Sequence, residues 1–234
     1  PIIWVEDTLQ ALQQLAQAYL RHVDPKVIAV TGSNGKTTTK DMIESVLAPE
    51  FKVKKTQGNY NNEIGMPLTI LQLDEDTEVS ILEMGMSGYH EIEALSQLAQ
   101  PDIGVITNIG ESHMQDLGSR EGIAQAKAEI VLGMKGNGLF IYDGDEPLLK
   151  PHVQKLQQLD SLSIGLSDEC DYVCQLNDVE DSGIHFTINE KEAYDLPILG
   201  THNMKNAAIA IAVGHAMNLD YETIHRNLSQ VQLT

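Results

Sequence analysis

Residues 31–38 read Thr-Gly-Ser-Asn-Gly-Lys-Thr-Thr, directly after the apolar run of residues 27–30 and before a segment of helical character. When a strand leads through two glycines and a lysine into a helix, the backbone N–H groups of the loop and the positive end of the helix face the same ligand position. This order predicts a phosphate-binding loop, in which Lys36 reaches the terminal phosphates and the Thr37 hydroxyl binds Mg²⁺. The strict motif has glycine where Val30 stands, so the loop is a variant. The residues predicted to contact the phosphorylated ligand are Gly32, Ser33, Asn34, Gly35, Lys36, Thr37 and Thr38.

The rest of the chain alternates between apolar strands and helices. Strands are predicted at residues 79–82, 103–107, 139–142 and 161–164, and helices at 9–20, 40–47, 91–98, 122–132, 204–217 and 221–231. Near-continuous apolar strands separated by helices indicate an α/β protein with a mostly parallel sheet, whose ligands gather at the carboxyl ends of the strands. Short alternating runs, such as residues 184–188, predict a small antiparallel edge sheet or hairpin near 171–199.

Acidic residues outnumber basic ones, with 34 Asp and Glu against 15 Lys and Arg and a net charge of −19. This excess disfavours the large phosphate-backbone interface that a nucleic acid requires. A free nucleotide with Mg²⁺ remains compatible, because a phosphate-binding loop neutralises its ligand locally. We therefore expect a small phosphorylated ligand and no nucleic-acid partner.

Cys170 and Cys174 are the only cysteines, and with no second pair or histidine doublet they lack the further ligands of a zinc site. We expect two reduced thiols. No segment approaches the roughly 20 apolar residues of a membrane span, and the first residues do not resemble a signal peptide. We expect a cytoplasmic protein. The chain begins without Met, on the apolar tetrapeptide of residues 1–4, and we expect a fragment of a longer protein.

Two polar side chains follow the ends of predicted strands. Glu83 comes directly after the strand at 79–82, where the second anchor of a Mg²⁺ beside a phosphate-binding loop belongs. The alternative is a solvated charge at a strand end. His113 lies just past the strand at 103–107, where a neutral imidazole would bind a second Mg²⁺ or orient a phosphate, although a lone histidine is more often structural.

Two further candidates lie on predicted helices. Lys127 sits in an apolar helical pattern, where a lysine ordinarily extends its ammonium to solvent, but where desolvation near metal ions would remove its proton. Asn203 and Asn206 are three residues apart, so one helical face can present both amides to a nucleobase. The alternative for His202 or Asn203 is a helix cap.

Several segments, in order along the chain, resemble the signature of the Mur ligases, which build the peptide of the bacterial cell-wall precursor. They are residues 31–39, 83–85, 108–113, 126–127 and 200–206. Residues 58–69, Gly-Asn-Tyr-Asn-Asn-Glu-Ile-Gly-Met-Pro-Leu-Thr, are similar to the family member that adds D-alanyl-D-alanine to the UDP-N-acetylmuramoyl tripeptide. The resemblance covers essentially the whole chain.

The resemblance implies an enzyme of three domains, of which this chain supplies the centre. Residues 1–22 would be the tail of an N-terminal UDP-sugar domain with its linker helix, and residues 23–234 the central ATP-binding domain. The C-terminal domain, which binds the incoming dipeptide, would be absent. We therefore expect the isolated chain to bind ATP weakly at most and to be inactive alone, and we expect a monomer.

The implied chemistry is ATP-dependent amide ligation through an acyl phosphate, in peptidoglycan precursor synthesis. The substrates would be D-alanyl-D-alanine and a UDP-N-acetylmuramoyl tripeptide whose third residue is lysine or diaminopimelate. The resemblance assigns the catalytic roles to Lys36, Lys127 and His113. It also implies that Thr37 and Glu83 hold one Mg²⁺, that His113 with a carbamylated Lys127 holds the other, that Asn203 and Asn206 contact adenine, and that Asn59, Asn61 and Asn62 face the UDP-sugar peptide.

Other functions fit parts of the same pattern. A phosphate-loop kinase acting on a small carboxylate or hydroxyl shares the loop but does not require Glu83, His113 and Lys127. A folate polyglutamate ligase shares the mechanism, but the segment 59–69 does not match it. A third alternative, of a different class, is a nucleotide-binding module without turnover.

Overall fold

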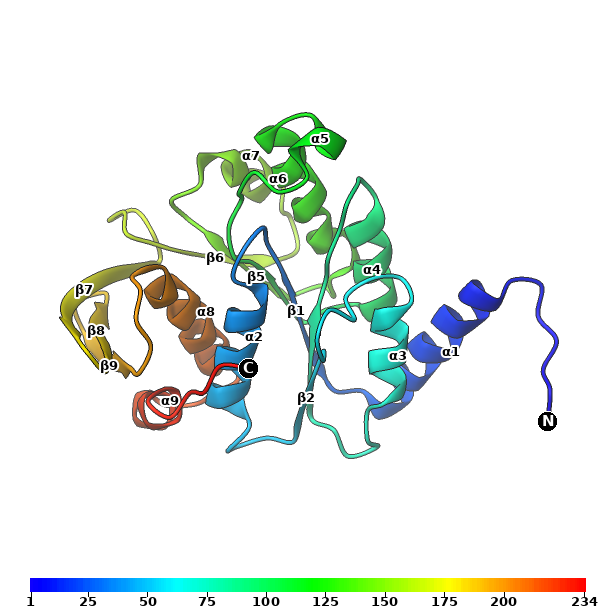
Figure 1. Ribbon diagram of the computed structural model, residues 1–234, viewed down its shortest axis with the longest axis horizontal. Coiled ribbons are helices and arrows are strands. Elements are labelled where there is room, and N and C mark those ends of the chain that lie inside the picture. The colour runs from blue at the N-terminus through cyan, green and yellow to red at the C-terminus, as the bar shows by residue number, and fades with distance from the viewer.

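Nine strands form one sheet in the order β2-β3-β1-β4-β5-β6-β7-β8-β9 in the computed structural model, which describes residues 1–234 (Figure 1). The strands are β1 Lys26–Thr31, β2 Val53–Lys55, β3 Val79–Glu83, β4 Ile103–Ile106, β5 Leu139–Asp143, β6 Asp160–Gly165, β7 Tyr172–Glu180, β8 Gly183–Ile188 and β9 Glu192–Leu196. Every pairing from β2 to β7 is parallel. The predicted α/β class and mostly parallel sheet are confirmed.

Helices cover both faces of the parallel part of the sheet. They are α1 Thr8–Val23, α2 Lys36–Leu47, α3 Gly65–Leu71, α4 Glu91–Ala99, α5 Met114–Leu117, α6 Arg120–Ala128, α7 Lys150–Gln154, α8 His202–Ala216 and α9 Tyr221–Leu228, with short 3₁₀ helices η1 Glu129–Gly133 and η2 Pro147–Leu149. None of them is long and apolar enough to cross a membrane.

Strand β1 explains why both faces need cover. Its side chains alternate between two cores, because successive residues of a strand point to opposite faces. Ile28 and Val30 pack with α2, α8 and α9, whereas Val27 and Ala29 pack with α1, α3, α4 and α6. A central strand buried on both sides reads as a continuous apolar run, which is the pattern of residues 27–30.

The far edge of the sheet is antiparallel. β8 pairs with β7 and with β9, and the β8–β9 turn places Asn189 and Glu190 in the left-handed region at φ values of 54° and 57°. This confirms the antiparallel edge predicted near residues 171–199. Cys170 and Cys174 are both free and buried, and burial raises the pKa of the Cys174 thiol to about 12.

Some predicted boundaries were wrong. The helix predicted at 122–132 becomes a 3₁₀ helix after Ala128, and the last helix ends at Leu228 rather than residue 231. Helix α3 was not predicted. It begins ten residues after the end of strand β2. Pro67 is the third residue of α3, where the missing N–H costs no bond because the first N–H groups of a helix have no intrahelical partner.

Candidate phosphate and metal site

The phosphate-binding loop joins β1 to α2 and requires both of its glycines. Gly32 and Gly35 adopt φ values of 151° and 80°. A Cβ atom on Gly32 would lie 1.8 Å from the Thr107 hydroxyl oxygen, so no side chain fits there. The position that holds glycine in the strict motif is Val30, which lies fully buried inside β1 and makes a regular strand pairing with Glu83. The variant loop therefore begins one residue further along, after a complete strand.

The first turn of α2 presents a row of unpaired donors. The backbone N–H groups of residues 35–38 donate to no protein acceptor, and the first helical bond at this end runs from Thr39 N to Gly35 O at 2.9 Å. Lys36 Nζ lies back across the loop and donates to Gly32 O at 2.9 Å. Burial lowers the pKa of Lys36, and the nearby Glu83 carboxylate opposes that shift. A row of free N–H groups at a helix start beside a lysine is an anion-binding arrangement.

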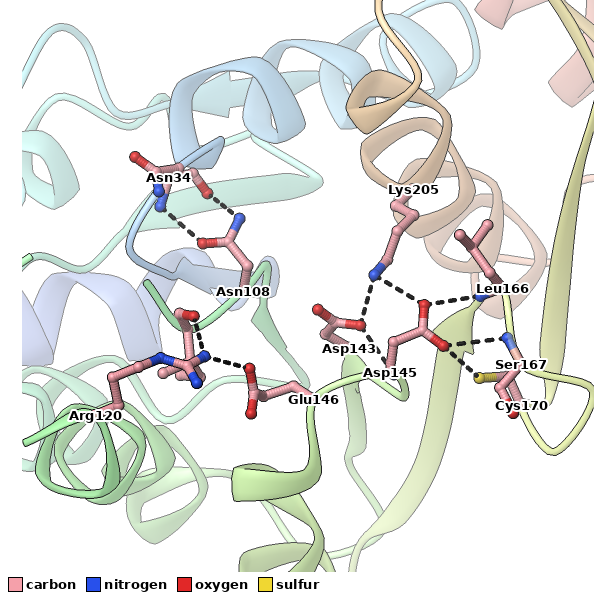
Figure 2. A network of polar contacts seen from close by, with 11 residues as sticks. Asn34, Asn108, Arg120, Asp143, Asp145, Glu146, Leu166, Ser167, Cys170 and Lys205 are labelled. Carbon is pink, nitrogen blue, oxygen red and sulfur yellow. Dashed lines mark hydrogen bonds and ion pairs between the residues drawn. The ribbon is translucent and has the colours of Figure 1, made fainter. Parts of the chain in front are cut away.

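The loop is clamped to the segment that follows β4 (Figure 2). Asn34 N donates to Asn108 Oδ1 at 3.0 Å, and Asn108 Nδ2 donates to Asn34 O at 2.9 Å. Thr107 Oγ1 also donates to Asn34 O at 2.6 Å, and Gly110 N donates to Ser33 Oγ at 2.8 Å. These contacts fix the loop to the segment after β4. Sequence reasoning missed the role of Asn108, although its position directly after a strand end was a signal.

Helix α6 is tied to the same segment. The Arg120 guanidinium donates to Ile109 O at 2.9 Å and to Glu146 Oε2 at 2.6 Å (Figure 2). This links the start of the helix that carries Lys127 to the turn after β5. Neither Arg120 nor Glu146 was a sequence candidate, because a single arginine near a helix start gives no pattern of its own.

Glu83 is the buried carboxylate of the site. It ends β3 opposite Val30, with 3% of its surface exposed, so the alternative of a solvated strand-end charge is wrong. Its Oε1 lies 3.3 Å from Lys40 Nζ and its Oε2 accepts from Asn61 Nδ2 at 2.7 Å. The carboxylate is therefore held between α2 and the segment before α3.

Lys127 lies inside the protein, not at its surface. Its side chain is 3% exposed and takes part in no hydrogen bond or ion pair, so the alternative of an ammonium extended to solvent is wrong. Burial, with a smaller contribution from the charge of Lys36, lowers the pKa of Lys127 from 10.5 to about 7. A substantial fraction of this amine is therefore neutral and nucleophilic near neutral pH.

We expect Lys127→Met to stabilise the fold, most strongly at low pH. The pKa of Lys127 is about 7 in the folded chain and 10.5 in the unfolded one, so between these values the unfolded chain binds the extra proton and wild-type stability rises with pH. Methionine removes this dependence. In CO₂-free urea titrations the variant should gain more than about 1 kcal/mol at pH 6, and less at pH 9. Lys150→Met, at an exposed position, is the control. An equal gain at both pH values would contradict the assignment.

His113 stands apart from the buried groups. It precedes the single turn of α5 at φ 63°, its side chain is 43% exposed, and its Nδ1 lies 3.6 Å from Asp116 Oδ2. No hydrogen bond or ion pair joins it to Glu83 or to Lys127. The structure thus places His113 on the ligand side of the sheet, past the end of β4, without bringing it into contact with the other predicted metal ligands.

Asn203 and Asn206 lie at the start of α8, and Asn206 lies against the phosphate-binding loop. Both are 6% exposed, and a Cβ atom on Gly35 would lie 3.2 Å from Asn206 Oδ1. Asn206 Nδ2 donates to Asn203 Oδ1 at 3.3 Å, so the two amides do share one face. Asn203 Nδ2 donates to Leu199 O at 2.9 Å, which anchors the helix start without the predicted cap geometry.

Lys205 lies between these two asparagines and was not a sequence candidate. Its ammonium donates to Asp143 Oδ1 at 2.7 Å and to Asp145 Oδ2 at 3.1 Å (Figure 2). Asp145 in turn accepts from the backbone N–H groups of Leu166 and Ser167 at 2.8 and 3.1 Å. The network fixes α8 against the ends of β5 and β6, and so fixes the direction of the two amides.

The three asparagines predicted to face the substrate have different surroundings. Asn59 is exposed, Asn61 is bonded to Glu83, and Asn62 Oδ1 accepts from Ile64 N and Gly65 N at 3.1 and 2.8 Å, which caps α3. Asn62 also lines a cavity of about 590 Å³ between α1 and α4. The segment thus joins the buried carboxylate to an open, polar cavity.

One further acidic cluster has a structural explanation. Ligand atoms of His90, Glu93 and Glu129 lie within 4.8 Å of one another. However, the Glu129 carboxylate already accepts from His90 N at 2.9 and 3.0 Å and from Glu93 N at 3.2 Å. A carboxylate at the positive end of α4 acts as a helix cap, and a cation there would oppose the helix dipole.

The donor set beside the loop suits Mg²⁺. Glu83 supplies a buried carboxylate, and Thr37, within the row of free N–H groups, supplies an exposed hydroxyl. Magnesium prefers oxygen ligands, few of them from the protein, with the rest from water and phosphate. The residues present therefore fit a Mg²⁺ that arrives with a polyphosphate.

The Mur ligase middle domain matches residues 30–214. The UDP-N-acetylmuramoyl-tripeptide–D-alanyl-D-alanine ligase of Bacillus subtilis is 54% identical over 236 residues, covering 100% of this chain and 50% of the relative. The enzyme of the same name from Synechocystis is 36% identical over 231 residues, covering 96% and 48%. The chain thus spans about half the length of the curated relatives it matches.

Two solved structures have the same fold over the whole chain. A crystal structure of MurF from Acinetobacter baumannii aligns with a TM-score of 0.92 at 30% identity and covers 100% of this chain and 53% of that one. MurF from Thermotoga maritima, solved in complex with ADP, aligns with a TM-score of 0.88 at 29% identity and covers 100% and 54%.

Proposed function

Because the chain belongs to the Mur ligase family, we propose that it forms the ATP-binding part of a ligase that adds D-alanyl-D-alanine to the UDP-N-acetylmuramoyl tripeptide. The observation that carries this proposal is the row of free N–H groups at residues 35–38, beside the buried Glu83 and Lys127. The sequence similarity supports the choice of substrates. Within the chain, we propose residues 23–234 as the ATP-binding domain and residues 1–22 as a linker from a UDP-sugar domain.

The proposed reaction has two steps. A carboxylate oxygen of the tripeptide attacks the γ-phosphorus of ATP, the bond to the ADP oxygen breaks, and an acyl phosphate forms. The amine of D-alanyl-D-alanine then attacks the acyl carbon and loses a proton, and phosphate leaves from the tetrahedral intermediate. Phosphoryl transfer of this kind depends mainly on positioning and on neutralising charge.

The residues of the loop neutralise and position the phosphates. The N–H groups of residues 35–38 bind the phosphate oxygens, and Lys36 turns from Gly32 O to the β- and γ-phosphates. Thr37 and Glu83 would hold one Mg²⁺, which when bound neutralises charge on the same oxygens. His113 and a carbamylated Lys127 would hold a second. Because His113 is exposed and touches neither partner, this second assignment requires its turn to move inward when the ligand binds.

The surroundings of Lys127 support the proposal that it is carbamylated. The neutral amine attacks the carbon of CO₂, a C–N bond forms, and one amine proton leaves, so that a cation becomes a carboxylate-like anion. Three features support this step: the side chain is 3% exposed, it has no acceptor or anionic partner, and burial lowers its pKa to about 7. The carbamate would also remove the repulsion between the charges of Lys127 and Lys36.

The nucleoside and the second substrate would lie on either side of the phosphates. Asn203 and Asn206 face the loop from α8 and would contact adenine, with Lys205 holding their helix in place. The UDP-sugar peptide would approach along Asn59, Asn61 and Asn62, next to the cavity between α1 and α4. Asn61 then connects the substrate side to the Glu83 carboxylate.

We expect phosphate release to require the dipeptide amine. The protein encoded by the complete reading frame, given ATP, Mg²⁺ and the UDP-linked tripeptide, should release phosphate at a sustained rate only after D-alanyl-D-alanine is added. Mass spectrometry should then detect the amide product. N-Acetylated D-alanyl-D-alanine is the control, because it lacks the nucleophilic amine.

A stable phosphoester formed without any amine would favour the kinase alternative. Nucleotide binding by calorimetry without turnover, in the complete protein, would favour the binding module. For this 234-residue chain alone, we expect weak ATP binding and no amide product.

A further inference from the structure

A buried ion pair adjoins the proposed metal ligand. Lys40 and Glu83 have side chains that are 2% and 4% exposed, with 3.3 Å between Nζ and Oε1. Lys40 lies four residues after Lys36, so the two side chains start from the same face of α2. No other carboxylate or hydrogen-bond acceptor contacts the Lys40 ammonium.

Stability does not explain this pair. Removing two charges from water costs several kcal/mol per ion, and well-packed apolar residues in the same place are often as stable or more so. The pair also has a fixed geometry, because Asn61 Nδ2 donates to the second carboxylate oxygen at 2.7 Å and Glu83 N donates to Thr56 Oγ1 at 2.9 Å. The Glu83 carboxylate is thus oriented from both sides before any ligand arrives.

We propose that Lys40 is a positioning residue that orients Glu83 and excludes a divalent cation from it until the nucleotide phosphates are present. This inference rests on the proposed role of Glu83 as a metal ligand. A free cation at Glu83 would face the contacting ammonium of Lys40 and the nearby charge of Lys36. Repulsion between such charges is strong in a buried site, because little water screens it. The phosphate oxygens of a bound nucleotide add negative charge beside Glu83, so that attraction of the cation exceeds its repulsion by the two lysines. The metal and the nucleotide therefore bind together.

A second pair on α2 supplies a matched control. Lys55 Nζ lies 2.7 Å from Asp41 Oδ1 and 2.9 Å from Glu44 Oε1, with a side chain only 8% exposed. Asp41 is further bonded by Thr234 and has no place in the proposed site. Lys55→Met therefore removes a buried ammonium that pairs with carboxylates of the same helix, and it leaves the Lys40–Glu83 pair in place.

The test measures Mn²⁺ binding to the protein encoded by the complete reading frame by the loss of the free-ion electron paramagnetic resonance signal, with and without ADP. We expect Lys40→Met to bind Mn²⁺ without ADP about tenfold or more tightly than the wild type, and the difference to narrow with ADP. Lys55→Met should behave as the wild type. Equal nucleotide-free affinity in Lys40→Met and the wild type would overturn the inference.

Glu83→Gln separates this inference from the proposed function. If Glu83→Gln leaves Mn²⁺ binding with ADP unchanged, Glu83 is not a ligand and the proposed site fails. If it weakens that binding while Lys40→Met gains nothing, only the role of Lys40 fails. If circular dichroism shows that Lys40→Met does not fold, Lys40→Gln replaces it, with the same Mn²⁺ affinities expected. The wild type gives an independent check, because Mn²⁺ binding as tight without ADP as with it would also overturn the inference.

Discussion

Lys36→Ala is expected to lower kcat/KM for amide ligation by about 10²–10³-fold, or about 3–4 kcal/mol of transition-state stabilisation. The reason lies in the loop geometry. Lys36 Nζ already lies over the loop, 2.9 Å from Gly32 O, at the start of the free N–H row. No other cation replaces it, because Lys40 is engaged by Glu83 and the lowered pKa of Lys127, about 7, leaves a substantial fraction of that amine uncharged near neutral pH.

The loss should fall mainly on kcat. In the proposed reaction Lys36 would act on the terminal phosphates, where charge shifts during transfer, whereas the N–H groups of residues 35–38 would remain to bind the nucleotide. ADP affinity, measured by calorimetry, should therefore fall less than kcat. Lys26→Ala is the control, because Lys26 begins the same strand at its opposite end and is 61% exposed. Near-normal turnover in Lys36→Ala would refute the assignment of the loop.

The phosphate-binding loop was predictable because its chemistry is local. Two glycines, a lysine and a threonine must be adjacent in sequence to meet one ligand at a helix start, and Gly32 is required by a contact with Thr107 that no side chain tolerates. The parallel sheet was predictable for a similar reason, since strands buried on both faces read as apolar runs.

The partners of the site were less predictable because they come from distant segments. Lys40 lies in an ordinary helical pattern, and only the pairing of β1 with β3 brings Glu83 to it, 43 residues away in sequence. Asn108 and Lys205 are similar cases, since each acts on a segment more than 60 residues away. Sequence periodicity reports which face of an element is buried, and not which polar groups meet there.

The sequence pattern alone does not predict the burial of Lys127, because a lysine in an apolar helix usually reaches solvent. Here the apolar residues of α6 pack in one core with residues of α4 and β4, and Lys127 itself is 3% exposed. The exposure of His113 is the opposite case. Its position past β4 was predicted, but its left-handed backbone conformation starts a helix of only four residues, which turns the ring toward Asp116.

Lys127→Ala is expected to lower kcat for ligation on the order of 10³-fold, and short carboxylic acids are expected to restore part of the loss. The substitution leaves a buried space where the side chain was, next to the positive charge of Lys36. Acetate or propionate can enter that space and supply the two oxygens that the carbamate would provide. The rescue should saturate with acid concentration and should be absent for an amine or an alcohol of the same size.

Two controls make this result specific to a carbamate. Lys36→Ala should not respond to the same acids, because it lacks a cation rather than an anion. The wild-type protein, equilibrated with ¹³C-bicarbonate, should give a carbamate carbon signal that Lys127→Ala lacks. The signal should weaken as pH falls below about 7, because protonation removes the nucleophilic amine. Full activity in CO₂-free buffer, or activity of Lys127→Ala that no acid restores, would show that the lysine acts without carbamylation.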